Sequence, residues 1–467
     1  MVKPGDLFLC VKGARFDGHR YLQQAAAAGA VAAVVSDWPE QNYGLTIIQV
    51  PEVANPVVKE IAGAFYGYPD RKLKLIGVVG TNGKTTSTYL LKSVLEAAGY
   101  QVGLIGTINN LAKNQIIQSD NEHHNTTPGV LDLQKLFAKM VAADVQFVVM
   151  EVSSHSIDQG RVHGLTFAGG IFTNITQDHL DYHKTFAEYL RVKSRFFSEL
   201  PSDAWAVLNI DDPNAAGMIR QTAATVLTYG IENSPQIAAE RIDLNPAGVS
   251  YTARTPKGDL EFKLNLTGYF NVYNSLGVIA AGLALGIDPN TIKTGLETVS
   301  GVPGRFQTVP NPDSFGVIVD YAHTPDGLEN ILKTARELSD AKLFLVFGCG
   351  GDRDRTKRPL MGALAAKIAD FTVITSDNPR SENPNEIIRE IEVGFKEANP
   401  NAQYRTEVDR EVAIRKVIAL AQKHDIVIIA GKGHETYQEF ADRTIHFDDR
   451  EVARKALEER AHGQLHA

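Results

Sequence analysis

Residues 80–86 read GTNGKTT, and their types are suited to holding a phosphate group. The apolar run before them, residues 73–79, predicts a buried strand, and apolar residues at helical spacing between Lys84 and Gly99 predict a helix. A glycine turn between a strand and a helix directs backbone N–H groups at an anion, and Lys84 adds a positive charge. Thr85 then has its hydroxyl where the magnesium ion of a nucleotide binds. A glycine turn that only connects two core elements is the alternative.

Two further candidate ligands follow strands that come later in the chain. Glu151 belongs to the apolar run QFVVMEV, and His179 lies just beyond the run GGIFTNI. Parallel strands meet ligands at their carboxyl ends, where a carboxylate holds Mg²⁺ directly or through water. An imidazole is a rarer magnesium ligand, but it also serves as a base that faces an amine. The alternative is that each residue is a helix cap or a satisfied polar group.

Lys193 occupies a position that helical periodicity assigns to the buried face. In KTFAEYLRVKSRFF the apolar stripe runs through Phe186, Leu190 and Phe197, with Lys193 in the same stripe. Burying an ammonium group is unfavourable unless it is paired or its pKa falls until it is neutral. One interpretation is that the side chain reaches along apolar surface to water. The other is that the lysine carries a carbamate formed with CO₂, which would be an anionic ligand for a second Mg²⁺.

The bulk composition is typical of a globular protein with several domains. At 467 residues the chain is too long for one core, and 43 % hydrophobic with 22 % charged residues are globular values. The net charge of −8 argues against a nucleic-acid or anionic-membrane surface, so the expected partners are small molecules. Cys10 and Cys349 are too few for a disulfide framework, and no signal segment or apolar stretch of ~18 residues is visible. We expect a cytoplasmic protein without membrane insertion.

Strands alternate with helices in three stretches of the chain. The first stretch holds DLFLCV, YLQQAAAAGA and VAAVVSD, which predict a strand, a helix and a strand. The second begins at residue 73 and predicts a mostly parallel sheet with helices on both faces, into which residues 222–271 insert an antiparallel segment. The third holds the strands FGVIVDYA, KLFLVFG, FTVITS and DIVIIAG and predicts a separate α/β unit. The expected fold class is therefore α/β.

A series of motifs occurs in the order found in the Mur ligases. They are GTNGKTT, NTTPG, EVSSHSIDQGR, TNITQDHLDYH, GYFNVYNSLGV, GRFQ, DYAHTPD, GCGGDRDRTKRP, DNPR and GKGHET. The chain resembles this family over nearly its whole length, and DNPR is typical of the branch that adds diaminopimelate. The resemblance implies a small α/β UDP-binding unit at 1–72, a central P-loop ATPase at 73–303 and a Rossmann-like amino-acid-binding unit at 304–467.

The same resemblance implies roles for particular residues. The nucleotide is expected at Gly80, Thr81, Asn82, Gly83, Lys84, Thr85, Thr86, Asn271, Arg305, Asp320 and His323. Metal ligands are expected at Thr85, Glu151, His179 and carbamylated Lys193, and the catalytic residues are Lys84, Lys193, His179 and Glu151. The muramoyl-peptide substrate is expected at His19, Arg20, Thr126, Thr127, Ser153, Gln159 and Arg161. A helix cap at Asn271 and a surface pair at Arg161 are the alternatives.

The resemblance also implies an amino-acid site at Arg353, Asp377, Asn378, Pro379, Arg380, Gly431 and Glu435. Residues 377–380 (DNPR) follow the strand FTVITS, at the edge where a Rossmann-like domain binds its ligand. A guanidinium grips a carboxylate with two parallel hydrogen bonds, which suits Arg380 to the distal carboxylate of meso-diaminopimelate. Lysine would leave Arg380 buried without a partner, at a cost of roughly 3–5 kcal/mol if the site is dry, or on the order of 10²- to 10³-fold in selectivity. A surface arginine in a proline turn is the alternative.

The implied reaction is the ATP-dependent addition of meso-2,6-diaminopimelate to the D-Glu γ-carboxylate of UDP-MurNAc-L-Ala-D-Glu through an acyl phosphate, a step of peptidoglycan precursor synthesis. Two Mg²⁺ ions, ATP as co-substrate and the CO₂-derived carbamate on Lys193 are expected to take part. We expect a monomer whose domains close during turnover. A lysine-adding ligase of the same family and an inactive nucleotide- or UDP-binding protein are the alternatives.

The amino terminus departs from the family pattern. The family usually carries a further segment with an Asp-Ser-Arg motif before VKPGDLF, whereas this chain has Met1 directly before it. We therefore expect part of the uridine pocket to be missing, which concerns the affinity for the UDP-sugar more than the ATP chemistry.

Overall fold

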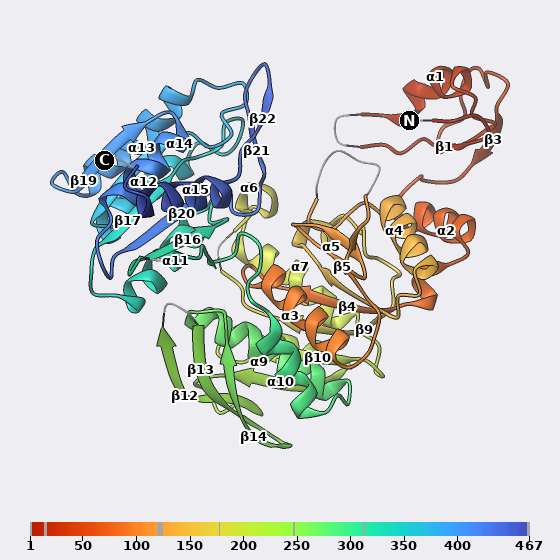
Figure 1. Cartoon of the computed structure of the whole chain (residues 1–467). Coiled ribbons are helices and arrows are strands. Elements are labelled where there is room, and N and C mark those ends of the chain that lie inside the picture. The colour runs from red at the N-terminus through yellow and green to blue at the C-terminus, as the bar shows by residue number, and fades with distance from the viewer. Residues whose placement is uncertain are drawn as a thin grey trace.

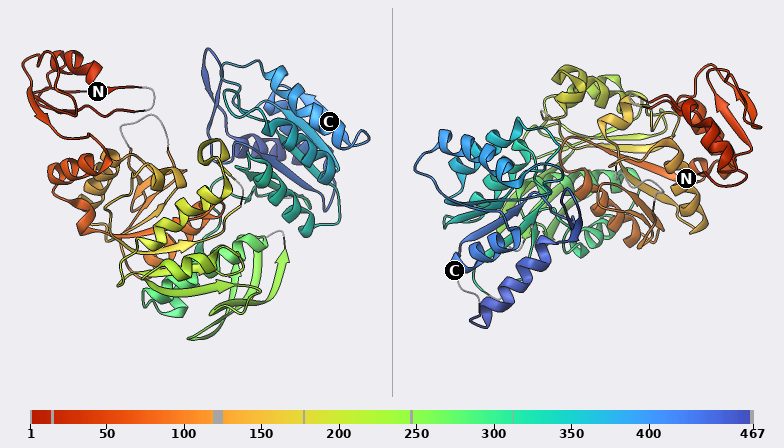
Figure 2. Two further views of the ribbon diagram at one scale, coloured as in Figure 1. Left: turned by 180° about the vertical axis from the view of Figure 1, so that it is seen from behind. Right: turned by 90° about the horizontal axis from the view of Figure 1, so that it is seen from above.

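The computed structural model describes residues 2–13, 16–118, 125–176, 178–245, 248–311 and 313–464 of the chain. The described strands form sheets of three, eleven and six strands in chain order, together with a two-stranded hairpin. The unit with the eleven-stranded sheet lies between the other two units in every view (Figures 1 and 2). The predicted α/β class is thereby confirmed, while domain boundaries at 72/73 and 303/304 stay predictions.

The first unit is a parallel sheet in the order β1-β2-β3. Its elements are β1 (Leu7–Leu9), η1 (Gly18–Tyr21), α1 (Leu22–Ala27), β2 (Ala32–Val35), β3 (Thr46–Gln49), α2 (Asn55–Tyr66) and η2 (Pro69–Lys72). The predicted strand, helix and strand are confirmed. α2 also packs on α4 (Val130–Ala142) of the central unit and lies beside it in Figure 1, so this helix links the two units.

The central sheet has the order β14-β13-β12-β11-β10-β9-β4-β8-β5-β6-β7. Its strands are β4 (Lys74–Val79), β5 (Val102–Ile105), β6 (Asn110–Ala112), β7 (Gln115–Ile116), β8 (Phe147–Glu151), β9 (Phe167–Phe172), β10 (Trp205–Asn209), β11 (Thr225–Gly230), β12 (Ile237–Asn245), β13 (Gly248–Thr255) and β14 (Gly258–Leu264). Pairing is parallel from β5 across to β12 and antiparallel at both ends. The antiparallel insert predicted over 222–271 is therefore wrong for β11, which extends the parallel sheet and also pairs in parallel with the start of β12.

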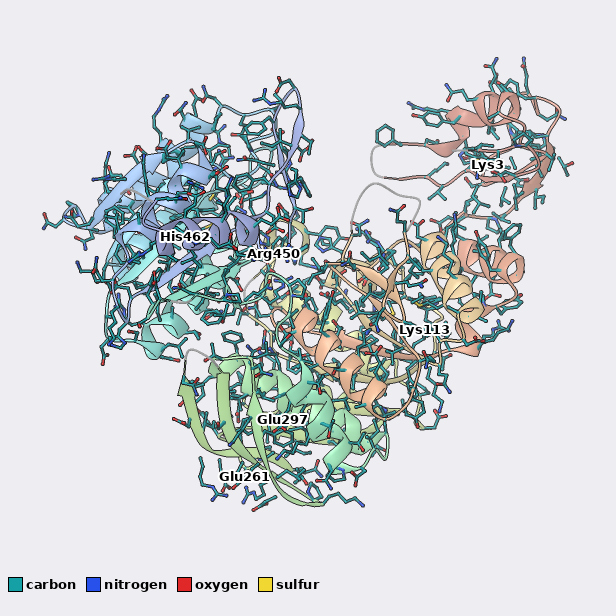
Figure 3. The ribbon with its side chains drawn as sticks, viewed as in Figure 1. Lys3, Lys113, Glu261, Glu297, Arg450 and His462 are labelled. Atoms are coloured by element: carbon teal, nitrogen blue, oxygen red, sulfur yellow. The ribbon has the colours of Figure 1, made fainter. Side chains whose placement is uncertain are left out.

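Helices cover both faces of the central sheet, as predicted. α3 (Lys84–Ala97), α9 (Tyr269–Ala284) and α10 (Pro289–Thr298) share one core with it, and α4, α7 (Phe186–Ser198) and α8 (Ala215–Gln221) share the other. The short helices α5 (Ser154–Asp158) and α6 (Leu180–His183) follow β8 and β9. Glu297 in α10 is labelled in Figure 3. Its carboxylate accepts a hydrogen bond of 2.9 Å from the N–H of Lys263, which ties α10 to β14.

The C-terminal sheet has the order β15-β16-β20-β17-β18-β19, and β15 is its antiparallel strand. The strands are β15 (Gln307–Thr308), β16 (Gly316–Asp320), β17 (Leu343–Phe347), β18 (Phe371–Thr375), β19 (Gln403–Glu407) and β20 (Ile426–Ala430), followed by the hairpin β21 (Tyr437–Glu439) and β22 (Thr444–His446). α11 (Pro325–Leu338), α12 (Lys357–Ile368) and α13 (Pro384–Ala398) pack on one face, and α14 (Arg410–Leu420) and α15 (Asp449–Ala461) on the other. The predicted strands of this unit are confirmed. Among the described residues, no helix has the length and apolar character needed to cross a membrane.

Two glycines give the loop between β4 and α3 its shape. Gly83 has a φ of +83°, and a Cβ there would lie 2.3 Å from Oδ1 of Asn274 in α9. A Cβ on Gly80 would lie 1.8 Å from Oγ1 of Thr173, so this position also has room only for glycine. Gly83 is the N-cap of α3 and carries no side chain to bond the first N–H groups of the helix. Those N–H groups therefore remain available to a ligand.

Candidate active site

The loop between β4 and α3 is folded around its own lysine. The Nζ atom of Lys84 donates to the carbonyl oxygens of Gly80 (2.9 Å) and Thr81 (2.7 Å). Thr173 Oγ1 donates to the carbonyl oxygen of Asn82 at 2.6 Å, which holds the loop from the end of β9. The ammonium group thus lies beside the open N-terminus of α3, an arrangement that suits an anion such as a phosphate.

Glu151 lies next to this loop at the carboxyl end of β8 and is 1 % exposed. Its Oε1 atom accepts from Thr85 Oγ1 (3.0 Å) and from the N–H of Thr107 (2.9 Å), and its Oε2 atom accepts from Thr107 Oγ1 (3.0 Å). From the C-terminal unit, Nη2 of Arg305 donates to Thr85 Oγ1 at 3.1 Å. Carboxylate and hydroxyl oxygens are the ligands that Mg²⁺ prefers, so this pair next to the loop fits the ion.

Lys193 is buried in α7 and is 2 % exposed, and its Nζ atom donates to the carbonyl oxygen of Gly80 at 2.7 Å. The interpretation in which this side chain reaches water along the surface is therefore wrong. The predicted stripe is also wrong at its start, because Phe186 is 37 % exposed whereas Tyr189 and Phe197 are fully buried. The buried face of the helix nevertheless delivers the lysine to the phosphate loop.

Two lysines thus meet at the carbonyl oxygen of Gly80. Loss of hydration lowers the pKa of Lys193 well below its ordinary value, and the charge of Lys84 lowers it further, against the attraction of Asp178. Loss of hydration also lowers the pKa of Lys84, against the attraction of Glu151 and Asp178. A lysine with a lowered pKa is neutral more of the time, and the neutral amine is the form that reacts with CO₂.

His179 begins the turn before α6 with a φ of +53°. Its Nε2 atom lies 3.5 Å from Oδ2 of Asp178, and its ring lies 4.8 Å from His155 and 6.4 Å from Tyr189 between centroids. Among the described residues, no group of three His, Cys, Asp or Glu side chains is arranged to hold a metal ion. A metal-binding role for His179 therefore stays a prediction.

Asn271 supports the phosphate loop from α9. Its Nδ2 atom donates to the carbonyl oxygen of Thr267 at 2.9 Å, and its Oδ1 atom accepts from Nδ2 of Asn274 at 3.2 Å. Asn274 in turn is the residue that packs against Gly83. The predicted alternative of a helix cap is wrong, because the N-cap of α9 is Gly268.

Asp320 fixes the turn that carries Arg305. It accepts hydrogen bonds from the N–H groups of Phe306 (2.6 Å) and Ala322 (2.7 Å). Burial raises the pKa of Asp320, while Arg305 and the two N–H groups act in the opposite direction. His323 is exposed, and its Nδ1 atom lies 2.9 Å from a backbone carbonyl oxygen two residues earlier. Of the predicted nucleotide residues in the C-terminal unit, Arg305 is the one that contacts the loop residue Thr85.

Asp326, near the start of α11, joins the C-terminal unit to the phosphate loop. Its Oδ2 atom accepts from Nδ2 of Asn82 at 2.9 Å and from Oγ1 of Thr176 at 3.1 Å. Together with the contact of Arg305, these bonds place the C-terminal unit against the phosphate loop. The segment that follows β9 thereby contacts both the loop and the C-terminal unit.

Residues predicted to hold the muramoyl-peptide form one bonded group, namely Thr127, Ser153, Gln159 and Arg161. Arg161 donates from Nη1 to the carbonyl oxygen of Thr127 at 2.8 Å and from Nη2 to Oε1 of Gln159 at 2.6 Å. The N–H of Ser153 donates to Thr127 Oγ1 at 3.0 Å. Thr126 adjoins the group, with its Oγ1 atom 3.1 Å from that of Thr107. The partners of Arg161 are an amide and a carbonyl, so the alternative of a surface ion pair is wrong.

His19 and Arg20 lie apart from this group, on η1 of the first unit. The Nδ1 atom of His19 lies 2.6 Å from Oδ1 of Asp17, and its Nε2 atom accepts from the N–H of Ser36 at 3.0 Å. These bonds put the proton on Nδ1, which donates to the carboxylate. Arg20 is exposed.

The segments DNPR and GKGHE meet at the carboxyl ends of β18 and β20. Asn378 is 2 % exposed, and its Oδ1 atom accepts from Nζ of Lys432 at 2.9 Å while its Nδ2 atom donates to Oε2 of Glu435 at 2.9 Å. Lys432 is fully buried and also donates to Glu435 Oε2 at 3.1 Å. Burial raises the pKa of Glu435, while the charge of Lys432 opposes the rise.

The other predicted amino-acid contacts surround this group. Gly431 has a φ of +117°, and a Cβ there would lie 2.6 Å from Oδ2 of Asp377. The carbonyl oxygen of Pro379 packs still more closely on Gly351, at 1.9 Å from where a Cβ would stand. Arg353 is exposed, and its Nη1 atom donates to a neighbouring backbone carbonyl at 3.1 Å.

Arg380 departs from the expectation. Its Nε atom donates to Oε2 of Glu439 at 2.9 Å and its Nη1 atom to the carbonyl oxygen of Gly351 at 2.8 Å, and its side chain is 19 % exposed. The prediction that lysine would leave this arginine without a partner is therefore wrong, and the selectivity estimate that rests on it loses its basis. A largely buried side chain with these two partners also argues against the alternative of a surface arginine in a proline turn.

Sequence reasoning missed Thr107, Asp326, Lys432 and Glu439. Thr107 follows the strand VGLI and could have been found as a polar residue at a strand end. Lys432 lies between two glycines in GKGHE, where no periodic pattern marks the lysine that the fold buries completely. Asp326 and Glu439 make their contacts across more than fifty residues of sequence, so no local pattern marks them.

Comparisons with known proteins cover nearly the whole chain. The family models described as Mur ligase family catalytic domain, Mur ligase middle domain and Mur ligase glutamate ligase domain match residues 1–71, 78–282 and 304–433. The chain is 48 % identical over 465 residues to UDP-N-acetylmuramoyl-L-alanyl-D-glutamate--2,6-diaminopimelate ligase of Geobacillus thermodenitrificans, covering 98 % of this chain and 93 % of that protein.

Solved structures agree in fold. A structure of UDP-N-acetylmuramoyl-L-alanyl-D-glutamate--2,6-diaminopimelate ligase is 31 % identical, covers 99 % of this chain and 93 % of its own, and superposes with a TM-score of 0.68. The MurF ligase of Thermotoga maritima in complex with ADP shares the fold at 18 % identity and a TM-score of 0.66, covering 98 % and 96 % of the two chains. The fold and the site define an α/β protein with a glycine-rich loop between β4 and α3 and a separate, mostly parallel C-terminal sheet. The chain belongs to the Mur ligase family.

Proposed function

We propose that this protein is an ATP-dependent, ADP-forming ligase that joins meso-2,6-diaminopimelate to the D-Glu γ-carboxylate of UDP-MurNAc-L-Ala-D-Glu in peptidoglycan precursor synthesis. The observation that carries the proposal is the 48 % identity, over 98 % of the chain, to a relative that bears this activity in its name. The juxtaposition of Lys84, Thr85 and Glu151 with Arg305 supports it.

The reaction has two steps. The γ-phosphoryl group of ATP passes to the substrate carboxylate, which gives an acyl phosphate and ADP. The amine nitrogen then attacks the carbonyl carbon, loses a proton, and expels inorganic phosphate as the C–O bond breaks. The first step brings two anions together and the second has to position a neutral amine at the acyl phosphate, so cationic groups and fixed positions supply most of the rate enhancement.

The cations near the loop are suited to the first step. Lys84 and the N-terminus of α3 would hold the outer phosphates of ATP, and Arg305 would approach them from the C-terminal unit. Thr127, Ser153 and Arg161 would orient the dipeptide end so that its carboxylate meets the γ-phosphate. Gly80, Thr81, Asn82, Gly83 and Thr86 complete the loop.

Magnesium fits the oxygen atoms beside this loop. Thr85 Oγ1 and Glu151 Oε1 lie 3.0 Å apart and would hold one ion, and a carbamate on Lys193 with His179 would serve a second. When bound, such ions neutralise phosphate charge. The carbamate forms when the neutral Lys193 amine adds to the carbon of CO₂ and releases one proton. Burial of this amine and its lowered pKa support the proposal.

The amino acid would bind in the C-terminal unit. Arg380 would take the distal carboxylate of meso-diaminopimelate, and Glu435 an ammonium group, next to Asp377, Asn378 and Gly431. Arg353 and Pro379 would border the site. The bonds of Asp326 to Asn82 and Thr176 would keep the C-terminal unit docked while the amine attacks.

Substrate-dependent phosphate release tests the proposal. We expect release only when ATP, Mg²⁺, UDP-MurNAc-L-Ala-D-Glu and meso-diaminopimelate are all present, with the tripeptide product identified by its mass. Equal use of L-lysine in place of meso-diaminopimelate would favour the lysine-adding alternative. Nucleotide binding without turnover would favour the inactive binding protein. We further propose that the protein acts in the cytoplasm and that it is a monomer. Sedimentation with and without substrates tests the oligomeric state.

A further inference from the structure

Glu439 at the end of β21 is bonded to two residues of the DNPR segment. The N–H of Arg380 donates to the carbonyl oxygen of Glu439 at 3.1 Å, and Nε of Arg380 donates to Oε2 of Glu439 at 2.9 Å. The N–H of Glu439 donates to Oδ1 of Asn378 at 3.0 Å. Gln438 adds a bond of 2.7 Å to the carbonyl oxygen of Asp377. The hairpin that carries Glu439 is therefore an integral wall of the amino-acid site.

The guanidinium of Arg380 has both of its edges in use. Nε faces Glu439, and Nη1 donates to the carbonyl oxygen of Gly351. A bidentate carboxylate binds either the Nε and Nη2 edge or the Nη1 and Nη2 edge. A substrate carboxylate that binds Arg380 in either way has to share a nitrogen with a protein group. The carboxylate of Glu439 is the one charged competitor among the described contacts of Arg380.

We infer that Glu439 is a specificity-determining residue that reduces the preference for an amine with a distal carboxylate over one without it. This inference rests on the proposed function. When meso-diaminopimelate binds, its distal carboxylate competes with Glu439 for Arg380 and lies near a like charge. When lysine binds, Glu439 still neutralises Arg380, which would otherwise face the ε-ammonium group unpaired. Glu439 thus reduces the selectivity between the two amines, because it weakens the binding of meso-diaminopimelate and favours the binding of lysine.

The size of the effect follows from exposure. The side chains of Arg380 and Glu439 are 19 % and 42 % exposed, so water screens part of their attraction. The free energy of a partly exposed ion pair is small to moderate. It corresponds to a change of about three- to tenfold in the ratio of the two kcat/KM values. Glu439→Gln removes the charge and keeps the length of the side chain and both backbone bonds. Asp442→Asn is the matched control, because it removes a charge from the same hairpin where Asp442 contacts Arg443, at 71 % exposure.

The experiment compares the full-length protein with Glu439→Gln and Asp442→Asn. The measured quantities are kcat and KM for meso-diaminopimelate and for L-lysine, with ATP and the UDP-dipeptide saturating, and the thermal midpoint as a check of folding. We expect Glu439→Gln to raise the ratio of the two kcat/KM values about three- to tenfold. The KM for meso-diaminopimelate should fall, the KM for lysine should rise, and Asp442→Asn should change neither.

Each outcome is decisive. A ratio that is unchanged or lower in Glu439→Gln, or one that rises equally in Asp442→Asn, overturns the inference and leaves the proposed function standing. Where lysine incorporation is below detection, the KM for meso-diaminopimelate decides, and a value that does not fall overturns the inference. A wild-type protein that incorporates neither amine refutes the proposed function and the inference with it. A purely structural role for Glu439 would move both KM values in the same direction.

Discussion

The phosphate loop and the proposed amino-acid site both lie at the carboxyl ends of parallel strands, yet their cationic side chains have different partners. In the loop, Lys84 donates to the backbone carbonyl oxygens of Gly80 and Thr81. In the C-terminal unit, Lys432 is paired with Glu435 and Arg380 with Glu439. One site therefore offers a lysine held by neutral groups, and the other offers cations that already have an anionic partner.

This difference matters for how each site recognises an anion. A protonated lysine held by carbonyl oxygens has no anionic partner to offset its charge, so Lys84 is suited to the high charge of a nucleotide phosphate, which in turn favours the protonated form. A paired cation attracts less strongly and binds by exchange of partners, which makes binding sensitive to where the ligand places its charges. The comparison predicts large effects from removing cations in the loop and smaller ones in the amino-acid site.

Lys84→Ala should have the largest effect. Loss of the one ammonium group that begins α3 should reduce substrate-dependent phosphate release by at least about 10²- to 10³-fold, because the γ-phosphate loses its nearest positioned charge. The thermal midpoint should stay within about 3 °C, since the glycines give the loop its shape. Lys333→Ala, an exposed residue on α11, is the control and should leave release unchanged. Retained turnover in Lys84→Ala would remove the phosphate-loop assignment.

Variants of Lys193 test whether this position holds a buried amine or a buried anion. We expect Lys193→Ala to reduce ligation by about 10²-fold or more and short carboxylic acids such as acetate or formate to restore part of it, because they return an anion to the site. Lys193→Met, which refills the space without a charge, should respond less to the acids. Steady-state rates with and without acetate measure this. Rescue by methylammonium in place of carboxylic acids would show that the amine itself is required.

Arg380→Ala should have a smaller effect than either lysine. We expect the KM for meso-diaminopimelate to rise about 10- to 50-fold with the KM for ATP unchanged, because a distal carboxylate would lose its partner and meet Glu439. Arg353→Ala, which removes an exposed arginine from the neighbouring loop, is the comparison and should change the KM less. Steady-state kinetics with the amine varied measures both. An unchanged KM in Arg380→Ala would leave the selection of the amine to other residues.

The sequence predicts the elements that carry the loop because their signals are local. The apolar run that became β4, the glycines after it and the stop near Gly99 lie within thirty residues, and the structure places them as predicted. The pairing direction predicted for β11 is wrong for a physical reason. A strand of mixed exposure has the same sequence pattern in a parallel and in an antiparallel sheet. Pairing direction is decided by tertiary contacts.

In the candidate site, too, residues with local signals were predicted and contacts between distant segments were not. A strand end indicated Glu151 and a broken periodic pattern indicated Lys193, whereas the family resemblance of DNPR indicated Arg380. It did not find that Arg380 has a carboxylate partner, because Glu439 lies fifty-nine positions later on a short hairpin. Residue types therefore indicated which groups could act, and only the fold showed how their charges are already balanced.

A third paired cation lies beneath the amino-acid site and extends the comparison to stability. Arg358 in α12 is fully buried and donates from Nη1 and Nη2 to the two carboxylate oxygens of Glu382, at 2.9 Å each. Glu390 and the carbonyl oxygen of Gly350 are its other partners. The hydrogen bonds from Arg358 lower the pKa of Glu382 to about 2 from its ordinary value of 4.5. The arginine thus holds the Gly350 loop beside Arg380.

Glu382→Gln should therefore have the smallest effect on ligation and a pH-dependent effect on unfolding. A carboxyl group whose pKa is lowered by folding stabilises the protein fully above the unfolded value of 4.5, and this contribution is lost as the pH falls towards 2. We expect the variant to lose about 1–1.5 kcal/mol of unfolding free energy at pH 7 and this loss to shrink between pH about 4.5 and 3. Urea titrations at several pH values measure it, with the exposed Glu386→Gln as the control. A loss that grows as the pH falls would contradict the assignment of an ionised Glu382 to the buried arginine.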